Sequence, residues 1–208
     1  MEGLQMAKEK REEALQLSSE GKFAESRLLY ETIAPVFEAA AAWEDYVDCL
    51  NRWSECLWRN AQFDAGIVQA TLALQIALEQ LGEEHEQVAV SYSNLGNCFL
   101  FKRNHEKAIE YHQKTLQLRL RTLNENQILI AKSYTNLGAC YKENGAYRQA
   151  IEYLKKAVQI FKANGNDNDL YISHCYNNLG SCYKEMGDYN LAIKCYQTTL
   201  EIRLKILD

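Results

Sequence analysis

Apolar and small residues recur along the chain with the spacing of an α-helix. One predicted helix face carries an aromatic residue, a leucine, a glycine and a second aromatic residue at i, i+3, i+4 and i+7, namely Tyr134, Leu137, Gly138 and Tyr141. The same series returns 42 residues later, and residues 130–165 laid on 172–207 give 14 identities in 36 positions. Self-similarity at a fixed period of about 20 to 50 residues is typical of a solenoid of stacked repeats.

This period predicts an all-α fold of five helix-turn-helix repeats, or ten helices. The repeats are expected at residues 3–40, 42–81, 86–123, 127–164 and 169–207, the first two being diverged, and together they form one solenoid over 1–208. Linkers rich in Asn, Gly and Asp, at 123–126 and 164–169, separate the last three repeats. The chain has a single proline, Pro35, so its composition also favours helix throughout.

A glycine recurs in the middle of the first helix of three repeats, as Gly96, Gly138 and Gly180. Glycine inside a helix costs up to about 1 kcal/mol relative to alanine, so close approach of the partner helix has to offset it. We expect the small residues of the second helices, which are Ala108, Ala150 and Ala192, to pack against these glycines.

Charge and cysteine content limit the classes of function. The net charge of −5 provides no basic footprint for nucleic acid and no attraction to anionic membranes. No apolar run approaches the roughly 20 residues that a membrane span needs, and the N-terminus lacks the pattern of a signal peptide. Seven cysteines without a secretion signal indicate a reduced, cytoplasmic setting.

No pattern of catalytic or metal-ligating residues is present. Four cysteines occupy the same repeat position, 42 residues apart: Cys56, Cys98, Cys140 and Cys182. Successive cysteines of this set therefore lie about one repeat from each other, which is too far for a disulfide. They are interpreted as small buried core residues. The four histidines lie on different helices and linkers, and no phosphate loop or nucleophile motif occurs. We therefore expect neither an enzyme nor a cofactor or metal site.

The helix stripe, followed by an alanine nine residues after the second aromatic residue, resembles the tetratricopeptide repeat. The 42-residue period and the linker at residues 81–89 are similar to the repeats of kinesin light chains, while residues 93–97 and 109–113 also resemble the Leu-Gly-Asn (Pins-type) repeats of cell-polarity adaptors. The resemblance implies a right-handed α-α superhelix whose first helices line a concave groove that binds a protein or peptide.

A second stripe on the first helices faces away from the partner helix, and the resemblance places it on the groove wall. Its candidate peptide-binding residues are Asn94, Asn97, Lys132, Asn136, His174, Asn178, Ser181 and Lys184. Asn94, Asn136 and Asn178 form a ladder, although asparagine is a poor residue in mid-helix. Two roles are open for this ladder: holding the backbone of an extended peptide, or bonding to the next repeat to fix the curvature of the solenoid.

The last predicted helix leaves apolar residues without a polar capping helix after it. This arrangement predicts that the chain is part of a longer protein or that it self-associates through this end. The main hypothesis is a protein-protein interaction scaffold. The alternative is a regulatory or sensor array at the N-terminus of a multidomain signalling protein or CHAT-type protease, acting on its own downstream domain.

Overall fold

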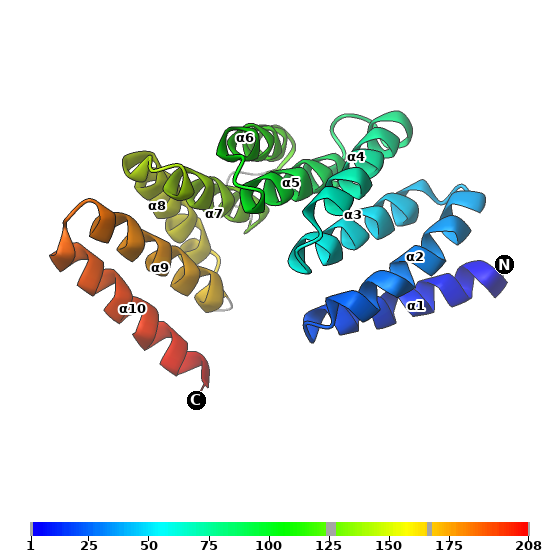
Figure 1. The fold of residues 1–208 in the computed structure, drawn as a ribbon. Coiled ribbons are helices and arrows are strands. Elements are labelled where there is room, and N and C mark those ends of the chain that lie inside the picture. The colour runs from blue at the N-terminus through cyan, green and yellow to red at the C-terminus, as the bar shows by residue number, and fades with distance from the viewer. Residues whose placement is uncertain (1, 124–127, 166–167, 208) are drawn as a thin grey trace. The chain divides into compact units, whose positions relative to one another are not determined.

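The computed structural model describes residues 2–123, 128–165 and 168–207, and these residues form ten α-helices and no strand (Figure 1). The helices are α1 (Glu2–Ser19), α2 (Phe23–Ala39), α3 (Trp43–Arg59), α4 (Phe63–Gln80), α5 (Glu86–Phe101), α6 (His105–Thr122), α7 (Ile128–Glu143), α8 (Tyr147–Ala163), α9 (Asp169–Glu185) and α10 (Tyr189–Leu207). The predicted all-α class and its ten helices are confirmed. The predicted linker residues 124–126 and 166–167 lie outside the described residues, as does residue 127 at the start of the fourth repeat.

The chain divides into two compact units. Unit 1 comprises residues 1–115, with α1 to α5 and most of α6, and unit 2 comprises residues 116–208, with the end of α6 and α7 to α10. Within each unit a second helix packs on its own first helix and on the first helix of the next repeat, as α8 packs on both α7 and α9. Part of the apolar surface of each helix pair is therefore buried by the neighbouring pair and not within the pair itself.

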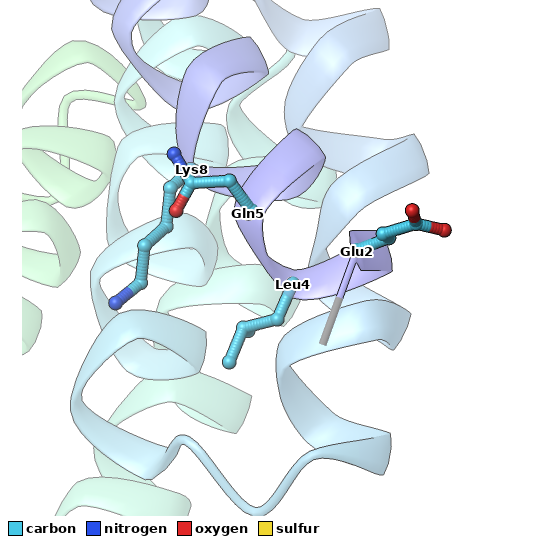
Figure 2. A pocket seen from close by; sticks show the side chains of 4 residues that line it. All are labelled: Glu2, Leu4, Gln5 and Lys8. Carbon is cyan, nitrogen blue, oxygen red and sulfur yellow. The ribbon is translucent and has the colours of Figure 1, made fainter.

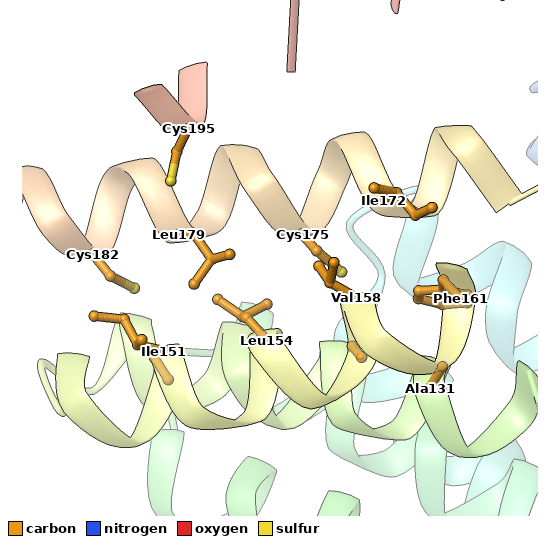
Figure 3. Packing of buried hydrophobic residues seen from close by; sticks show 12 residues of the cluster. Ala131, Ile151, Leu154, Val158, Phe161, Ile172, Cys175, Leu179, Cys182 and Cys195 are labelled. Atoms are coloured by element: carbon orange, nitrogen blue, oxygen red, sulfur yellow. The ribbon is translucent and has the colours of Figure 1, made fainter. Parts of the chain in front are cut away.

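The core of unit 2 lies between α8 and its two neighbours (Figure 3). Leu154 of α8 points towards Leu179 of α9 and Val158 lies beside Cys175, while Ala131 of α7 and Cys195 of α10 also belong to the cluster. Leu154 is fully buried, as is expected for a residue enclosed by two helix pairs. The core thus runs from one repeat into the next.

Aromatic rings join the first and second helices of a repeat. Tyr134 and Tyr141 of α7 both contact Tyr153 of α8, with ring-centroid distances of 6.0 and 5.4 Å. The corresponding residues of unit 1 repeat this arrangement: Tyr92, Phe99 and Tyr111. The aromatic stripe recognised in the sequence is therefore packing between helices, at offset-stacking distances.

The mid-helix glycines allow close helix approach, and their nearest neighbours are large side chains of the second helices. A Cβ at Gly138 would lie 2.6 Å from Cγ of Leu154, whereas Ala150 contributes only its carbonyl oxygen, at 3.4 Å. Gly96 and Gly180 meet the residues equivalent to Leu154 in their repeats, His112 at 2.6 Å and Tyr196 at 2.8 Å. Ala150 thus lies at the predicted contact, and the atoms nearest to the three glycines belong to a large residue one turn further along the second helix.

The diverged second repeat reverses the sizes of the two residues at this contact. Ser54 of α3 stands at the position of Gly96, and Ala70 of α4 stands at the position of His112. Both are fully buried. The hydroxyl of Ser54 donates to the carbonyl oxygen of Gly66 on α4 at 2.8 Å, so this repeat combines a larger residue on the first helix with small residues on the second.

The turn inside each repeat needs a left-handed backbone. Gly145 and Gly187 adopt φ values of 76° and 81° there, which glycine tolerates without steric cost. Ala61 and Arg103 occupy the same turn in the second and third repeats, with φ values of 58° and 60°. These two residues therefore carry strain that the glycine-containing turns avoid.

Candidate functional site

The predicted site residues lie on first helices in both units, and unit 2 contains most of them. Side-chain contacts join α7 to α9. Nζ of Lys142 donates to Oδ1 of Asn178 at 3.0 Å, and the hydroxyl of Thr135 lies 3.3 Å from Sγ of Cys175. Nζ of Lys132 lies 4.6 Å from the ring centroid of Tyr171. The structure thus brings Lys132 and Asn178 to the α7–α9 contact, together with Lys142 and Tyr171, which were not among the predicted residues.

The other predicted residues of unit 2 differ in exposure. Asn136 and Ser181 are half-buried, whereas His174 and Lys184 are exposed. Partial burial lowers the pKa of His174, and the positive charge of Arg203 on α10 lowers it further. His174 therefore stays mostly neutral at pH 7 and presents an imidazole rather than a cation.

Positive charges on the α7–α9 face have acidic neighbours. Nζ of Lys142 lies 3.1 Å from a carboxylate oxygen of Glu143, and Nζ of Lys184 lies 3.7 Å from one of Glu185. Each carboxylate offsets the charge of its lysine, and Glu143, Lys184 and Glu185 are exposed and screened by solvent. The face is consequently a mixed polar surface rather than a cationic one.

Asn94 belongs to a hydrogen-bonded network between α3 and α5 in unit 1. It is only 6% exposed, and its Nδ2 donates to the carbonyl oxygen of Asn51 at 2.9 Å. The hydroxyl of Ser91 donates to Oδ1 of Asn51 at 2.9 Å, and Nδ2 of Asn51 donates to Oε1 of Gln87 at 2.8 Å. Asn94 therefore joins two successive repeats by a hydrogen bond. Asn97, three residues further along α5, is half-buried.

This network has a counterpart in unit 2. Asn51 and Ser91 occupy the repeat positions of Thr135 and Cys175, which are the pair in contact between α7 and α9. Sequence reasoning did not find these positions, because neither keeps one residue type along the array: one holds Asn, Ser, Thr and Asn, and the other holds Cys, Ser, Ser and Cys. A polar residue such as Asn51 in mid-helix was the available signal.

Cysteine chemistry is suppressed by burial. All seven cysteines are free and buried. Burial raises the pKa of the Cys98 and Cys140 thiols to about 12, and that of Cys182 to about 11. The thiolate that a nucleophile or metal ligand requires is therefore rare at neutral pH. No group of three or more His, Cys, Asp or Glu residues suited to a metal occurs in the described ranges.

The described part of the chain has several open surface depressions. One on α1 is lined by Glu2, Leu4, Gln5 and Lys8, all from a single helix, and Figure 2 shows their side chains pointing in different directions. Convergent polar groups, which mark small-molecule sites, are missing from this depression. None of the helices within the described ranges is both long and apolar enough to span a membrane.

Comparison with known proteins gives a consistent family and fold. The sequence profile of the tetratricopeptide repeat matches residues 45–121 and 129–205. A search of curated protein sequences finds no match.

Similar solved structures include BtubC (BKLC) from P. vanneervenii, at 23% identity and a TM-score of 0.77, covering 99% of this chain and 91% of that chain. Kinesin-light-chain-like repeats from Podosopora anserina match at 17% identity and a TM-score of 0.75, over 99% of both chains. A Rap protein complexed with Competence and Sporulation Factor matches at 19% identity and a TM-score of 0.81, over 94% of this chain and 53% of that chain. The resemblance to kinesin-light-chain repeats is confirmed at the level of the fold.

Proposed function

The chain belongs to the tetratricopeptide repeat family, and from this premise we propose that it is a protein-interaction scaffold whose α7–α9 face binds an extended peptide. The observation that carries the proposal is the row of half-buried polar groups where α7 meets α9, with Asn178 beside Lys142 and Lys132 beside Tyr171. A side-chain amide offers a peptide backbone one donor and one acceptor. The Rap neighbour, solved with Competence and Sporulation Factor bound, supports ligand binding by this kind of array.

The ladder asparagines have different roles in this proposal. Asn94 is buried and bonds to α3, so its contribution is to hold two repeats together. Asn136 and Asn178 are half-buried, and we assign to them the contact with the peptide backbone. Asn97, Lys132, His174, Ser181 and Lys184 would tune the choice of peptide, and the neutral state of His174 favours hydrogen bonding over ion pairing.

The test begins with selecting peptides from a displayed library against the 208-residue chain. The affinity of one selected peptide is then measured by calorimetry for the parent and for Asn136→Ala with Asn178→Ala. We expect binding to fall at least tenfold while the melting temperature drops by no more than a few degrees. Asn177→Ala is the matched control, because Asn177 is an exposed neighbour on the same helix. Equal losses of binding and stability in the double variant would assign both asparagines to structure instead.

A second candidate role follows from the outer face of α10. Ile193 and Leu200 are 54% and 58% exposed, whereas their counterparts one repeat earlier, Ile151 and Val158, are buried against α9. Exposed apolar surface of this kind marks a contact with another protein surface. A regulatory array that contacts its own downstream domain, or a self-associating chain, would use this face.

Light scattering over a range of concentrations separates these alternatives. Self-association predicts a mass that rises with concentration and falls back to the monomer in Leu200→Lys. A constant monomer mass would exclude self-association through this face. Whichever partner covers this face, we infer a non-enzymatic protein. The seven free thiols support a cytoplasmic setting.

A further inference from the structure

The outer face of α4 is apolar where the third and fourth repeats are charged. Val68 and Leu72 are 64% and 36% exposed. The equivalent positions of the third repeat hold Glu110 and Lys114, which form an ion pair at 2.7 Å. Residues 65–78 of α4 contain no charged side chain at all. Apolar residues on the outer as well as the inner face are typical of a helix that is covered on both sides.

α10 is the second helix whose outer face is apolar. Besides Ile193 and Leu200, described above, Leu204 is 54% exposed. In the described part of the chain 17 large apolar residues are exposed, and ten of them lie on α4 and α10. Exposed apolar surface gathered in this way marks a contact with another protein surface, and here it gathers on two separate helices.

The charged residues of these two helices have opposite signs. α4 has a net charge of −2, because its only charged residues are Asp64 and Glu79, which flank the uncharged stretch at either end. α10 has a net charge of +2, from three cations and one carboxylate: Lys194, Glu201, Arg203 and Lys205. All four of these side chains are exposed.

Ion pairs with neighbouring elements reduce both charges but leave their signs unchanged. Lys102, at the end of α5, pairs with Asp64. Nζ of Lys205 lies 3.2 Å from a carboxylate oxygen of Asp169 on α9. The net charge is then −1 for α4 with Lys102 and +1 for α10 with Asp169. The two apolar faces therefore remain electrostatically complementary.

The charge of the two units has the same asymmetry. Residues 1–115 contain 19 acidic and 11 basic side chains, a net charge of −8, whereas residues 116–208 contain 9 acidic and 12 basic side chains, a net charge of +3. Complementary fields steer association and disfavour pairs of like sign. Unit 1 of one copy consequently attracts unit 2 of another copy.

Other ways of covering these faces with a second copy are less favourable. A two-fold contact of α10 with α10 joins two positive faces, and one of α4 with α4 joins two negative faces. Stacking α10 on α1 as if α1 began a further repeat buries carboxylates. Cys175 and Leu179 of α9 pack against α8, and α1 holds Glu9 and Glu13 at the equivalent positions.

We propose that the outer face of α10 in one copy of the chain docks on the outer face of α4 in a second copy. The proposal rests on the second candidate role given to α10 above and deepens it, because it names the surface that α10 contacts. Each copy carries both faces, so the contact is heterologous, and it either closes a ring of copies or extends a chain of them.

Sedimentation velocity over a range of concentrations tests the contact. The α4 variant is Val68→Glu with Leu72→Lys, which installs the residue pair that the third repeat carries and therefore suits the fold. The α10 variant is Leu200→Lys. We expect each variant to weaken self-association at least tenfold. Leu170→Lys is the matched control, because Leu170 is 52% exposed on α9, outside both faces, and it should change the association constant less than twofold.

A mixture of the two variants gives the sharper result. The α4 variant keeps an intact α10 face and the α10 variant keeps an intact α4 face, so one heterologous contact is possible between them. We expect each variant alone to sediment as a monomer and the mixture to form a one-to-one heterodimer, which a misfolded variant would not produce. A mixture that stays monomeric while the parent associates would overturn the proposal.

Salt tests the charge argument. Raising the NaCl concentration from about 0.05 to about 0.5 M should weaken self-association of the parent at least threefold, because the attraction between exposed charges is screened. Association that is unchanged or tighter at high salt would refute the part played by charge in choosing a second copy.

The outcomes distinguish this proposal from the ones before it. A parent that remains monomeric at every concentration would overturn it, together with self-association through α10. Association lost in Leu200→Lys but kept in the α4 variant would leave α10 self-associating and overturn the assignment to α4. Asn136→Ala with Asn178→Ala should leave the association constant unchanged, whatever its effect on peptide binding. Loss of association in that double variant would count against a contact between α10 and α4.

Discussion

The contact between Gly138 and Leu154 offers a quantitative test of how a repeat is packed. In Gly138→Ala the new Cβ would lie 2.6 Å from Cγ and 2.8 Å from Cδ2 of Leu154, which is fully buried and has little room to move. Overpacking of this kind costs about 1–3 kcal/mol, and alanine returns up to about 1 kcal/mol of helix propensity. We expect a net loss of about 1–2 kcal/mol in the free energy of unfolding.

The second half of the test restores space opposite the new methyl group. Leu154→Ala alone should cost about 2–5 kcal/mol, because it leaves a cavity in the core. In the double variant the added Cβ no longer meets the leucine, so the overpacking cost disappears and the helix-propensity gain remains. The two substitutions should therefore couple favourably by about 1–3 kcal/mol. The native pair Ser54 and Ala70 in the second repeat shows that the fold accepts this exchange of sizes.

Urea unfolding provides the measurement. Circular dichroism at 222 nm follows all helices, and tryptophan fluorescence follows unit 1, where all three tryptophans lie. Gly3→Ala is the matched control, because a Cβ at Gly3 meets nothing within 4 Å, and it should change stability by less than about 0.5 kcal/mol. Strict additivity of the two core substitutions, or a Gly138→Ala variant as stable as Gly3→Ala, would refute the packing argument.

The remaining predictions concern buried polar groups, thiols and a strained turn. Asn94→Ala should destabilise the chain by about 1–3 kcal/mol, because it removes a buried hydrogen bond between α5 and α3. Asn178→Ala, at a half-buried position, should cost less than about 1 kcal/mol. Urea unfolding compares the two variants, and equal losses of stability would contradict the argument from burial. Burial raises the pKa of Cys140 from an ordinary value of 9.0 to about 12, so between these pH values the folded chain keeps a proton that the unfolded chain loses. The contribution of the protonated thiol to the stability of the folded chain is therefore fully present below pH 9 and is lost as the pH rises towards 12. Melting temperatures should fall over that interval, less steeply in Cys140→Ala, and an identical slope in both proteins would disprove the assignment. Arg103→Gly should stabilise the chain by about 1 kcal/mol, because Arg103 has a φ of 60°. Ala61→Gly, at the equivalent turn of the second repeat, should have the same effect. A lower melting temperature in both variants would show that these turns are unstrained.

The candidate site was predictable only in part. The stripe of polar residues on the first helices follows from helical periodicity, and residues such as Lys132 and Asn178 do lie where α7 meets α9. Whether an asparagine in that stripe faces solvent or the next repeat depends on a rotation of a few tens of degrees about the helix axis. That rotation is set by how neighbouring pairs pack, and no single helix encodes it. Asn94 is buried in a bond to α3, while Asn136 is half-buried.

The sequence alone determined the local structure of this protein. A period of 42 residues, apolar spacing at three and four residues, and glycine in the turns were sufficient to place ten helices, because these features depend on contacts within one repeat. The tertiary structure decided which side chains meet across helices. It placed Leu154 nearest to Gly138, and Arg59 against the rings of Phe23 and Trp58. Such contacts depend on side-chain length and helix rotation together, and neither can be read from the spacing of residue types.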